Sequence, residues 1–292
     1  EFCVIWLGPE FAGDQARDDA GSLAFDTPVL GSDLDLVGQD ELELEITSDQ
    51  PIALLAVRLN YVRPDRSVSR ITYGLQNLTH IVSHEHPEAL EPGQRYFCRI
   101  RLDDVARTVP KGHKLRLSLS TSYWPMMWPA PEPVSLTIHT ARSWLTVPAR
   151  AAQPGEAAPV FPEPVSAPPV NLVELRSPSN SREQTEDEAT GEVTITIVDD
   201  FGLYQNTGHG LIAGETGRET HSIRPDDPLS ARMTTHWTQE IRRDDISLRT
   251  ETWSAMHASA GHFHLTARIE AWRDDTLVFE RDFAEDIDRD FN

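Results

Sequence analysis

The residues best suited to contact a ligand or another domain lie in a short aromatic segment, residues 122–133 (SYWPMMWPAPEP), which holds one tyrosine, two tryptophans, two methionines and four prolines. Such side chains can stack on a sugar or a drug-like ring, pack against another domain, or close the end of a hydrophobic core. Prolines next to Trp124 and Trp128 argue against a central strand, because proline donates no ladder hydrogen bond. We therefore expect an edge or a crossing loop, with Tyr123, Trp124 and Trp128 as candidate contact residues.

Two groups of closely spaced histidines could bind a metal. His80, His84 and His86 lie in LTHIVSHEHPE, where the spacing of His84 and His86 would place both on one face of a strand. Two imidazoles and a neighbouring carboxylate could ligate zinc, but no H-E-x-x-H motif is present. A polar loop or domain contact is favoured for this group, and an exposed strand face for His262 and His264 in GHFHL. We expect no metal and no cofactor.

The acidic and nucleophilic residues form no recognised catalytic motif. Asp14, Asp18, Asp19 and Asp26 could supply oxygen ligands to calcium, but they lack the alternating spacing of a calcium loop, so a solvated acidic loop is favoured. The G-x-S-x-G signature of α/β-hydrolases is absent. Cys98, within the alternating run RYFCRIRL, is expected to be a packed small hydrophobe. No residue of this chain is assigned to catalysis.

The amino-acid composition disfavours some classes of binding partner. The 292 residues include 47 acidic and 26 basic side chains, for a net charge of −21. This charge disfavours nucleic acid and anionic membranes, and no apolar run approaches the roughly 18 residues of a membrane span. The two cysteines, Cys3 and Cys98, exclude a disulfide-stapled scaffold and favour a cytoplasmic location. Because the sequence begins at Glu1 rather than Met, we expect a piece of a longer protein.

A proline-rich stretch divides the chain. Seven of the 21 prolines lie between Pro148 and Pro169, spaced by alanine, glycine and serine, which is typical of a semi-rigid linker. We predict a first domain at 1–150, a linker at 151–170 and a second domain at 171–292. The net charge is −6 for residues 1–150 and −15 for the remainder. The polar residues 180–190 are expected to form a mobile loop.

Alternation of apolar and polar residues indicates strands in both halves. ELELEI, KLRLSLS and SLTI alternate in the first half, whereas PIALLAVRLNYV is continuously apolar, as in a strand buried on both faces. Long alternating runs follow the linker, separated by polar turns at residues 242–245 and 273–276. One turn of helix is expected near 103–109. The prediction is an all-β chain: an antiparallel jelly-roll sandwich followed by a second antiparallel β unit, which could be an open sheet or a small barrel.

Several stretches resemble the C-terminal β domain of CocE/NonD-type hydrolases, in the X-prolyl dipeptidyl-peptidase and cocaine-esterase-like superfamily. The most specific are LEPGQRY at residues 90–96 and PKGHKLRLSLS at 110–120, together with SLAFDTPVLGSDLDLVGQD further upstream. The resemblance covers residues 14–148 and extends less specifically over 224–289. It implies a galactose-binding-like jelly roll, in which His113 has a structural role.

The resemblance further implies that this chain is the non-catalytic C-terminal part of a serine hydrolase. Its partner would be an upstream α/β-hydrolase domain that carries the Ser–His–Asp triad, and a homo-oligomer is a further expectation. The candidate pocket wall or domain interface is Tyr123, Trp124 and Trp128, with His84 and His86 nearby. Two alternatives stay open. The chain could be a free-standing jelly-roll module that binds carbohydrate or peptide, or an enzyme with an unrecognised acid/base or metal site.

Overall fold

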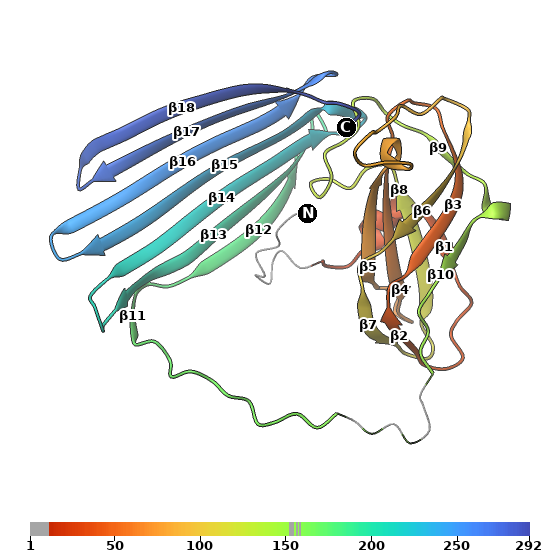
Figure 1. Cartoon of the computed structure of the whole chain (residues 1–292), viewed down its shortest axis with the longest axis horizontal. Coiled ribbons are helices and arrows are strands. Elements are labelled where there is room, and N and C mark those ends of the chain that lie inside the picture. The colour runs from red at the N-terminus through yellow and green to blue at the C-terminus, as the bar shows by residue number, and fades with distance from the viewer. Residues whose placement is uncertain (1–11, 152–154, 156, 158) are drawn as a thin grey trace. The chain divides into compact units, whose positions relative to one another are not determined.

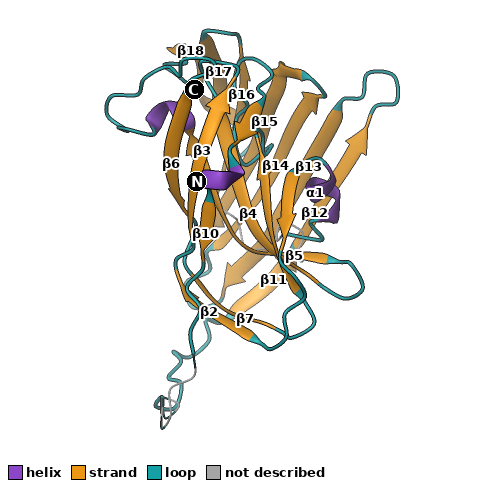
Figure 2. Cartoon of the chain, turned by 90° about the vertical axis from the view of Figure 1, so that its right-hand side faces the viewer, coloured by secondary structure: helices purple, strands orange, loops and turns teal. Residues whose placement is uncertain are grey.

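The chain is almost entirely built of antiparallel strands. The computed structural model describes residues 12–151, 155, 157 and 159–292, so Cys3 lies outside the described residues. The described residues form two compact units: the first comprises those up to 157 together with 291–292, and the second comprises 159–290 (Figure 1). Among the residues that the structure describes, helix is limited to α1 (Ala16–Ala20) and to the 3-10 turns η2 (Leu78–His80) and η3 (Thr140–Arg142) (Figure 2). The predicted all-β class is confirmed.

The first unit is a sandwich of two main sheets. One sheet has the order β1-β8-β4-β5, formed by β1 (Leu23–Asp26), β8 (Lys114–Ser120), β4 (Leu54–Val62) and β5 (Val68–Asn77). The other has the order β10-β3-β6, with β9 also paired to β3, and comprises β10 (Trp144–Thr146), β3 (Glu41–Ser48), β6 (Arg95–Arg101) and β9 (Leu136–Ile138). A separate pair joins β2 (Leu34–Gly38) to β7 (Val105–Val109).

The core lies between these two sheets and follows the alternation in the sequence. On β3 the aliphatic side chains Leu42, Leu44 and Ile46 are at most 2% exposed. The alternating glutamates of β3 face outward and form ion pairs with arginines of β6, including Arg99–Glu43 at 2.7 Å. Strand β4 is buried over nearly its whole length, as its continuous apolar sequence predicts.

Two local predictions were wrong. The stretch expected to hold a turn of helix is strand β7, whose partner β2 supplies its backbone hydrogen bonds. The polar stretch expected to be a loop contains β12 (Ser179–Glu186), which pairs with β13 (Val193–Asn206) over eight residues. In both cases pairing with a neighbouring strand outweighs the weak local preference of the sequence.

The second unit is a single open sheet and not a small barrel, the two arrangements that the sequence pattern left open. Its order is β11-β13-β14-β15-β16-β17-β18, with β12 also paired to β13. The remaining strands are β11 (Leu172–Arg176), β14 (Ile212–Arg224), β15 (Asp227–Arg243), β16 (Ile246–Ala258), β17 (His262–Arg273) and β18 (Thr276–Asp288). The tight turns after β15 and β17 place Asp244 and Asp274 at φ of 54° and 53°, in the left-handed region that aspartate tolerates.

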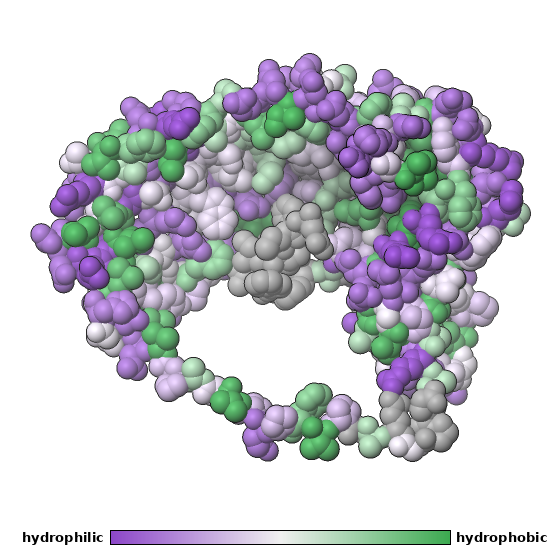
Figure 3. Space-filling view, in the orientation of Figure 1, coloured by the Kyte–Doolittle hydropathy of each residue, from purple (hydrophilic) through white to green (hydrophobic). Residues whose placement is uncertain are grey.

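At the start of the second unit, residues 159–171 form no helix or strand and are exposed. Val160, Phe161 and Val165 are 78–99% exposed, and in Figure 3 this stretch is a single string in which hydrophobic and hydrophilic residues follow one another. With five prolines in 159–169, the stretch offers few backbone donors for strand pairing. No helix in the described part of the chain is long and apolar enough to span a membrane.

Candidate functional site

Tyr123 is anchored on the outer face of the sheet that contains β4 and β5. Arg70 of β5 donates a hydrogen bond of 2.7 Å from Nη1 to the Tyr123 hydroxyl. The Arg58 guanidinium of β4 lies 5.5 Å from the centroid of the Tyr123 ring, and the Tyr73 ring lies 6.4 Å from it. Two cations and a second aromatic ring therefore fix the start of the aromatic segment.

Arg58 is itself held by a buried polar cluster beneath α1. Its Nη2 lies 3.2 Å from Asp19 Oδ1, and both side chains are almost fully buried. Asp19 Oδ1 also accepts hydrogen bonds from Ser118 Oγ at 2.7 Å and Asn60 Nδ2 at 3.1 Å. Gln15 Oε1 accepts from Arg58 Nη1 at 3.1 Å. The cluster pairs both terminal nitrogens of the buried guanidinium, whereas Nε has no hydrogen bond to a described residue, and it leaves the guanidinium face available to the tyrosine ring.

Trp124 and Trp128 form an edge-to-face pair just beyond Tyr123. Their ring centroids are 5.1 Å apart and the ring planes make an angle of 78°. The Met127 amide donates to the Tyr123 carbonyl at 2.9 Å, so the chain turns back between the two tryptophans. All three aromatic side chains are half-buried, and the segment is a loop outside the ladder, as its prolines predict. The geometry leaves part of each ring available for contact.

The histidines do not have the arrangement that their spacing suggested. His84 and His86 lie in a loop, residues 81–94, which we call the histidine loop, and not on one face of a strand. His84 instead faces His80, with the two Nδ1 atoms 3.3 Å apart. The amide of His86 donates to Ser83 Oγ at 3.0 Å, a local bond that turns the chain away from an extended conformation.

The histidine loop and the aromatic segment leave the same end of one sheet. Asn77 at the end of β5 pairs with Leu54, and Ser120 at the end of β8 pairs with Ala56, both near the start of β4. Topology thus brings two segments about 40 residues apart in sequence to one end of the sandwich. The described contacts of the two histidines nevertheless do not reach the aromatic rings. His84 contacts His80, and His86 contacts Ser83 within the histidine loop.

The four aspartates considered as calcium ligands form hydrogen bonds or ion pairs within the first unit. Asp14 Oδ1 accepts from the amides of Val68 at 2.9 Å and Ala16 at 3.0 Å, and these bonds lower the pKa of Asp14. Hydrogen bonds from Arg116 likewise lower the pKa of Asp26. Among the residues that the structure describes, no group of three or more His, Cys, Asp or Glu side chains could hold a metal ion.

The other residues singled out from sequence have separate structural settings. Cys98 is buried in β6, and burial raises the pKa of its thiol to about 11. His262 and His264 lie on β17, where His262 Nε2 is 3.1 Å from Asp288 and His264 Nδ1 is 2.6 Å from Asp286. These pairs tie the last two strands of the sheet together.

Two features of the first unit escaped sequence reasoning. Asp40, between β2 and β3, is fully buried, and its carboxyl oxygens accept no hydrogen bond from any described residue. Burial raises the pKa of Asp40 to about 6. In addition, an apolar cleft of about 380 Å³ opens between the two sheets, with Phe25 and Trp144 at its mouth and buried leucines at its base. Neither depends on a local motif, since both arise where separate strands meet.

The first unit is thus an antiparallel β-sandwich that carries a half-buried aromatic loop on one of its sheets. The model of the X-Pro dipeptidyl-peptidase C-terminal non-catalytic domain matches residues 6–160 of this chain, which is more than half of its length. The chain therefore belongs to this family, and the resemblance of its motifs to that domain is confirmed. Among curated proteins, none matches the chain.

Solved structures of hydrolases are similar to part of the chain. A selenomethionine-labelled α-amino acid ester hydrolase has 17% identity and a TM-score of 0.46, covering 48% of this chain and 28% of its own. An aminopeptidase from a marine sediment Thaumarchaeota archaeon has 16% identity and a TM-score of 0.46, with coverages of 49% and 28%. A CocE/NonD family hydrolase from Staphylococcus aureus has 17% identity and a TM-score of 0.38, with coverages of 47% and 32%. The chain spans about a third or less of each.

Proposed function

We propose that this chain is the non-catalytic C-terminal part of a serine hydrolase of the X-prolyl dipeptidyl-peptidase or acyl-esterase type. In the complete protein, its first unit packs against an α/β-hydrolase domain that precedes it. The contact surface consists of the aromatic segment, with Tyr123, Trp124 and Trp128 at its centre and the histidine loop beside it. The observation that carries the proposal is the anchoring of Tyr123 on Arg70 and Arg58, on the outer face of one sheet of a domain whose family is described as non-catalytic.

The anchoring suits a permanent contact surface for two reasons. Tryptophan, tyrosine and arginine dominate the binding energy of protein interfaces, and methionine is enriched there. A surface that is already ordered loses little conformational entropy when it docks. Val82 of the histidine loop is 87% exposed, so a second apolar group is available at the same end. Docking of the hydrolase domain would remove these groups from water.

The role of the first unit would be indirect. A β domain that covers the mouth of a hydrolase site excludes water from the acyl-enzyme and supplies one wall of the pocket for the acyl or leaving group. Aromatic rings on that wall would select the shape of the substrate without taking part in bond breaking. The same surface could instead hold the subunits of a homo-oligomer together. Changing the surface would then dissociate the subunits of the complete protein, whereas a surface that forms a pocket wall would lose activity.

The non-catalytic role is tested on the chain itself with a fluorophosphonate probe, which reacts with activated serines. Intact mass measurement should give the mass of the unmodified chain, because the G-x-S-x-G motif that shapes the nucleophile turn is absent. The described residues do hold one Ser–His–Asp chain, in which Ser259 Oγ lies 3.1 Å from His264 Nε2 and His264 Nδ1 lies 2.6 Å from Asp286 Oδ1. A stoichiometric adduct would overturn the proposal and assign an enzymatic activity to this chain.

The contact surface is tested in the complete polypeptide that includes the hydrolase domain. The double variant Trp124→Ala, Trp128→Ala should lower the thermal midpoint of that protein and reduce kcat/KM by about tenfold or more, since interface tryptophans each contribute on the order of 2 kcal/mol. Trp144→Ala is the matched control, because Trp144 is 52% exposed on a different strand, β10. Equal behaviour of the double variant and wild type would exclude the aromatic segment as the contact surface.

A further inference from the structure

The sheet of the second unit has two chemically different faces. Residues directly opposite one another on neighbouring strands share a face, so each cross-strand row can be assigned to one side. One face carries the row Ile195, His221, Met233, Met256 and Leu265. The other carries a row of short side chains, Thr196, Thr220, Thr234, Ala255, Thr266 and Ala284. The second face is the polar one.

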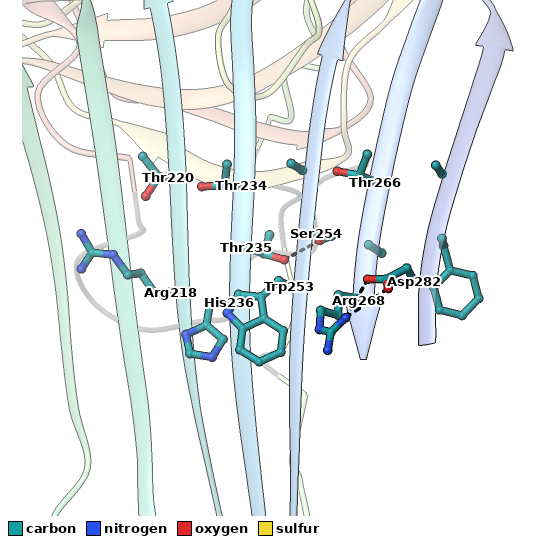
Figure 4. Close-up of a pocket in the computed structure, with 14 residues that line it drawn as sticks. Arg218, Thr220, Thr234, Thr235, His236, Trp253, Ser254, Thr266, Arg268 and Asp282 are labelled. Carbon is teal, nitrogen blue, oxygen red and sulfur yellow. Dashed lines mark hydrogen bonds and ion pairs between the residues drawn. The ribbon is translucent and has the colours of Figure 1, made fainter. Parts of the chain in front are cut away.

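A shallow pocket of about 610 Å³ lies on this polar face. Its floor is the row of threonines and alanines, and its wall is the next row, Arg218, His236, Trp253, Arg268 and Asp282 (Figure 4). The two rows are two residues apart on each strand, about 7 Å. The pocket therefore forms because a row of short side chains lies beside a row of long ones. Its long direction runs across the strands and not parallel to them.

The centre of the wall is an aromatic platform made of His236 and Trp253. The ring planes differ by only 7° and the centroids are 4.9 Å apart. In Figure 4 the two rings are seen side by side with their faces toward the viewer. His236 is held by a 2.5 Å contact between its Nε2 and Glu251 Oε2, and Thr238 Oγ1 donates to the same oxygen at 2.8 Å. The platform is thus fixed before any ligand arrives.

The two arginines of the wall differ in their pairing. Arg268 forms ion pairs with Glu270, Glu280 and Asp282, so its charge is neutralised within the sheet. Arg218, at the opposite end of the platform, is exposed and has no ion pair with any residue that the structure describes. Residues 151–292 carry a net charge of −15, so this guanidinium is a local exception. It offers a two-pronged donor to a carboxylate.

The floor adds neutral hydrogen-bonding groups. The hydroxyls of Thr220, Thr234 and Thr266 have no hydrogen bond to another described residue, whereas the hydroxyl of neighbouring Thr235, on the other face, is bound to Ser254 at 2.6 Å. Each free hydroxyl can both donate and accept. A ligand with several hydroxyl groups could exchange hydrogen bonds along this row.

We propose that this pocket binds an oligosaccharide through a uronic acid residue. The C–H face of a pyranose ring fits the exposed ring face of the stacked His236–Trp253 pair, the threonine row meets the sugar hydroxyls, and Arg218 pairs with the carboxylate. A peptide is less suited, because extended peptides bind along the edge of a sheet through backbone hydrogen bonds. The acidic surroundings favour a ligand with a single carboxylate among neutral sugars over a polyanion. This inference does not rest on the function proposed for the first unit.

The test compares two probes by calorimetry on the whole chain: xylotriose that carries one glucuronic acid substituent, and unsubstituted xylotetraose. The acidic probe should bind saturably and about tenfold more tightly than the neutral one. Arg218→Ala should remove that difference, whereas Arg243→Ala should not, because Arg243 lies at the β15–β16 turn away from the pocket. Trp253→Ala should abolish binding of both probes, and Trp253→Phe should retain it as a folding control.

Three results would overturn the inference. Wild-type chain that binds neither probe has no sugar site of this kind. Equal affinity for both probes, unchanged by Arg218→Ala, removes the role of the guanidinium. Tighter binding of a glutamate-containing peptide than of the acidic sugar would identify the pocket as a protein contact. Circular dichroism of each variant establishes that a loss of binding does not result from unfolding.

Discussion

The Arg58 guanidinium and the Asp19 carboxylate form a buried ion pair that joins strand β4 to helix α1. The helix has only five residues, which is too short to be stable by itself. Its position therefore depends on Asp19, whose carboxylate also accepts bonds from Ser118 and Asn60. Through Arg58, the same pair supports the ring of Tyr123. One buried charge pair thus links the helix, the sheet and the candidate contact surface.

Replacing Asp19 should be strongly destabilising. Asp19→Ala leaves the Arg58 charge buried without its main partner, and we expect the free energy of unfolding to fall by about 3–5 kcal/mol. Asp18→Ala is the matched control, because Asp18 is 55% exposed and 3.8 Å from Arg58, and should cost about 0–1 kcal/mol. Urea denaturation measures both. Similar losses for the two variants would contradict the role assigned to Asp19.

Tyr123→Phe removes only the hydroxyl that binds Arg70. The lost hydrogen bond involves a charged donor at 2.7 Å, so we expect about 1–2 kcal/mol of destabilisation. Tyr204→Phe serves as a control, since the Tyr204 hydroxyl has no hydrogen bond to a described residue, and should change stability by less than about 0.5 kcal/mol. If Tyr123→Phe were as silent as the control, the aromatic segment would not be anchored in this way.

Asp40 should make the first unit less stable as pH rises. Its pKa in the fold is about 6, above the ordinary value of 3.8, because burial penalises the charged form. Stability is therefore unaffected below pH 4 and falls between about pH 4 and 6, by about 3 kcal/mol in total. Asp40→Asn should match wild type near pH 4 and exceed its unfolding free energy at pH 8. An Asn variant that is less stable at both pH values would reveal a partner for the carboxylate.

Gly217→Ala should disturb the second unit. A Cβ atom at Gly217 would lie 2.7 Å from Trp237 Cζ2, so the indole must move, and we expect a cost of about 1–3 kcal/mol. Trp237 packs on Phe201 with ring centroids 6.2 Å apart, and a shift should change the near-ultraviolet circular dichroism. Gly261→Ala is the control, because nothing lies within 4 Å of its added Cβ. An unchanged spectrum and stability for Gly217→Ala would show that the sheet relaxes freely there.

Sequence patterns predicted the elements that depend on alternation. The run from Glu41 to Ile46 places leucines and isoleucine in the core and glutamates outside, because successive side chains of a strand point to opposite faces. The same reasoning failed for 105–109 and for much of 180–190, where polar residues form strands β7 and β12. There the neighbouring strand, and not the local composition, supplies the reason for extended structure.

The candidate contact surface could be predicted only in part. The prolines beside Trp124 and Trp128 indicated a loop, since they cannot take part in a ladder. Nothing in the sequence pointed to Arg58 and Arg70 as the residues that hold Tyr123, because they lie more than 50 positions away. The even spacing of His84 and His86 suggested one strand face, but Ser83 turns the loop locally.

By itself, the sequence determined the all-β class, the position of many strands and the family motifs of the first half, because these depend on residues close together in the chain. Only the tertiary structure decided which strands are neighbours, and with them the burial of Asp40, the Arg58–Asp19 pair and the pocket beside His236 and Trp253. The physical reason is register. A row of side chains across a sheet takes one residue from each strand, and its members become neighbours only when backbone hydrogen bonds set the pairing.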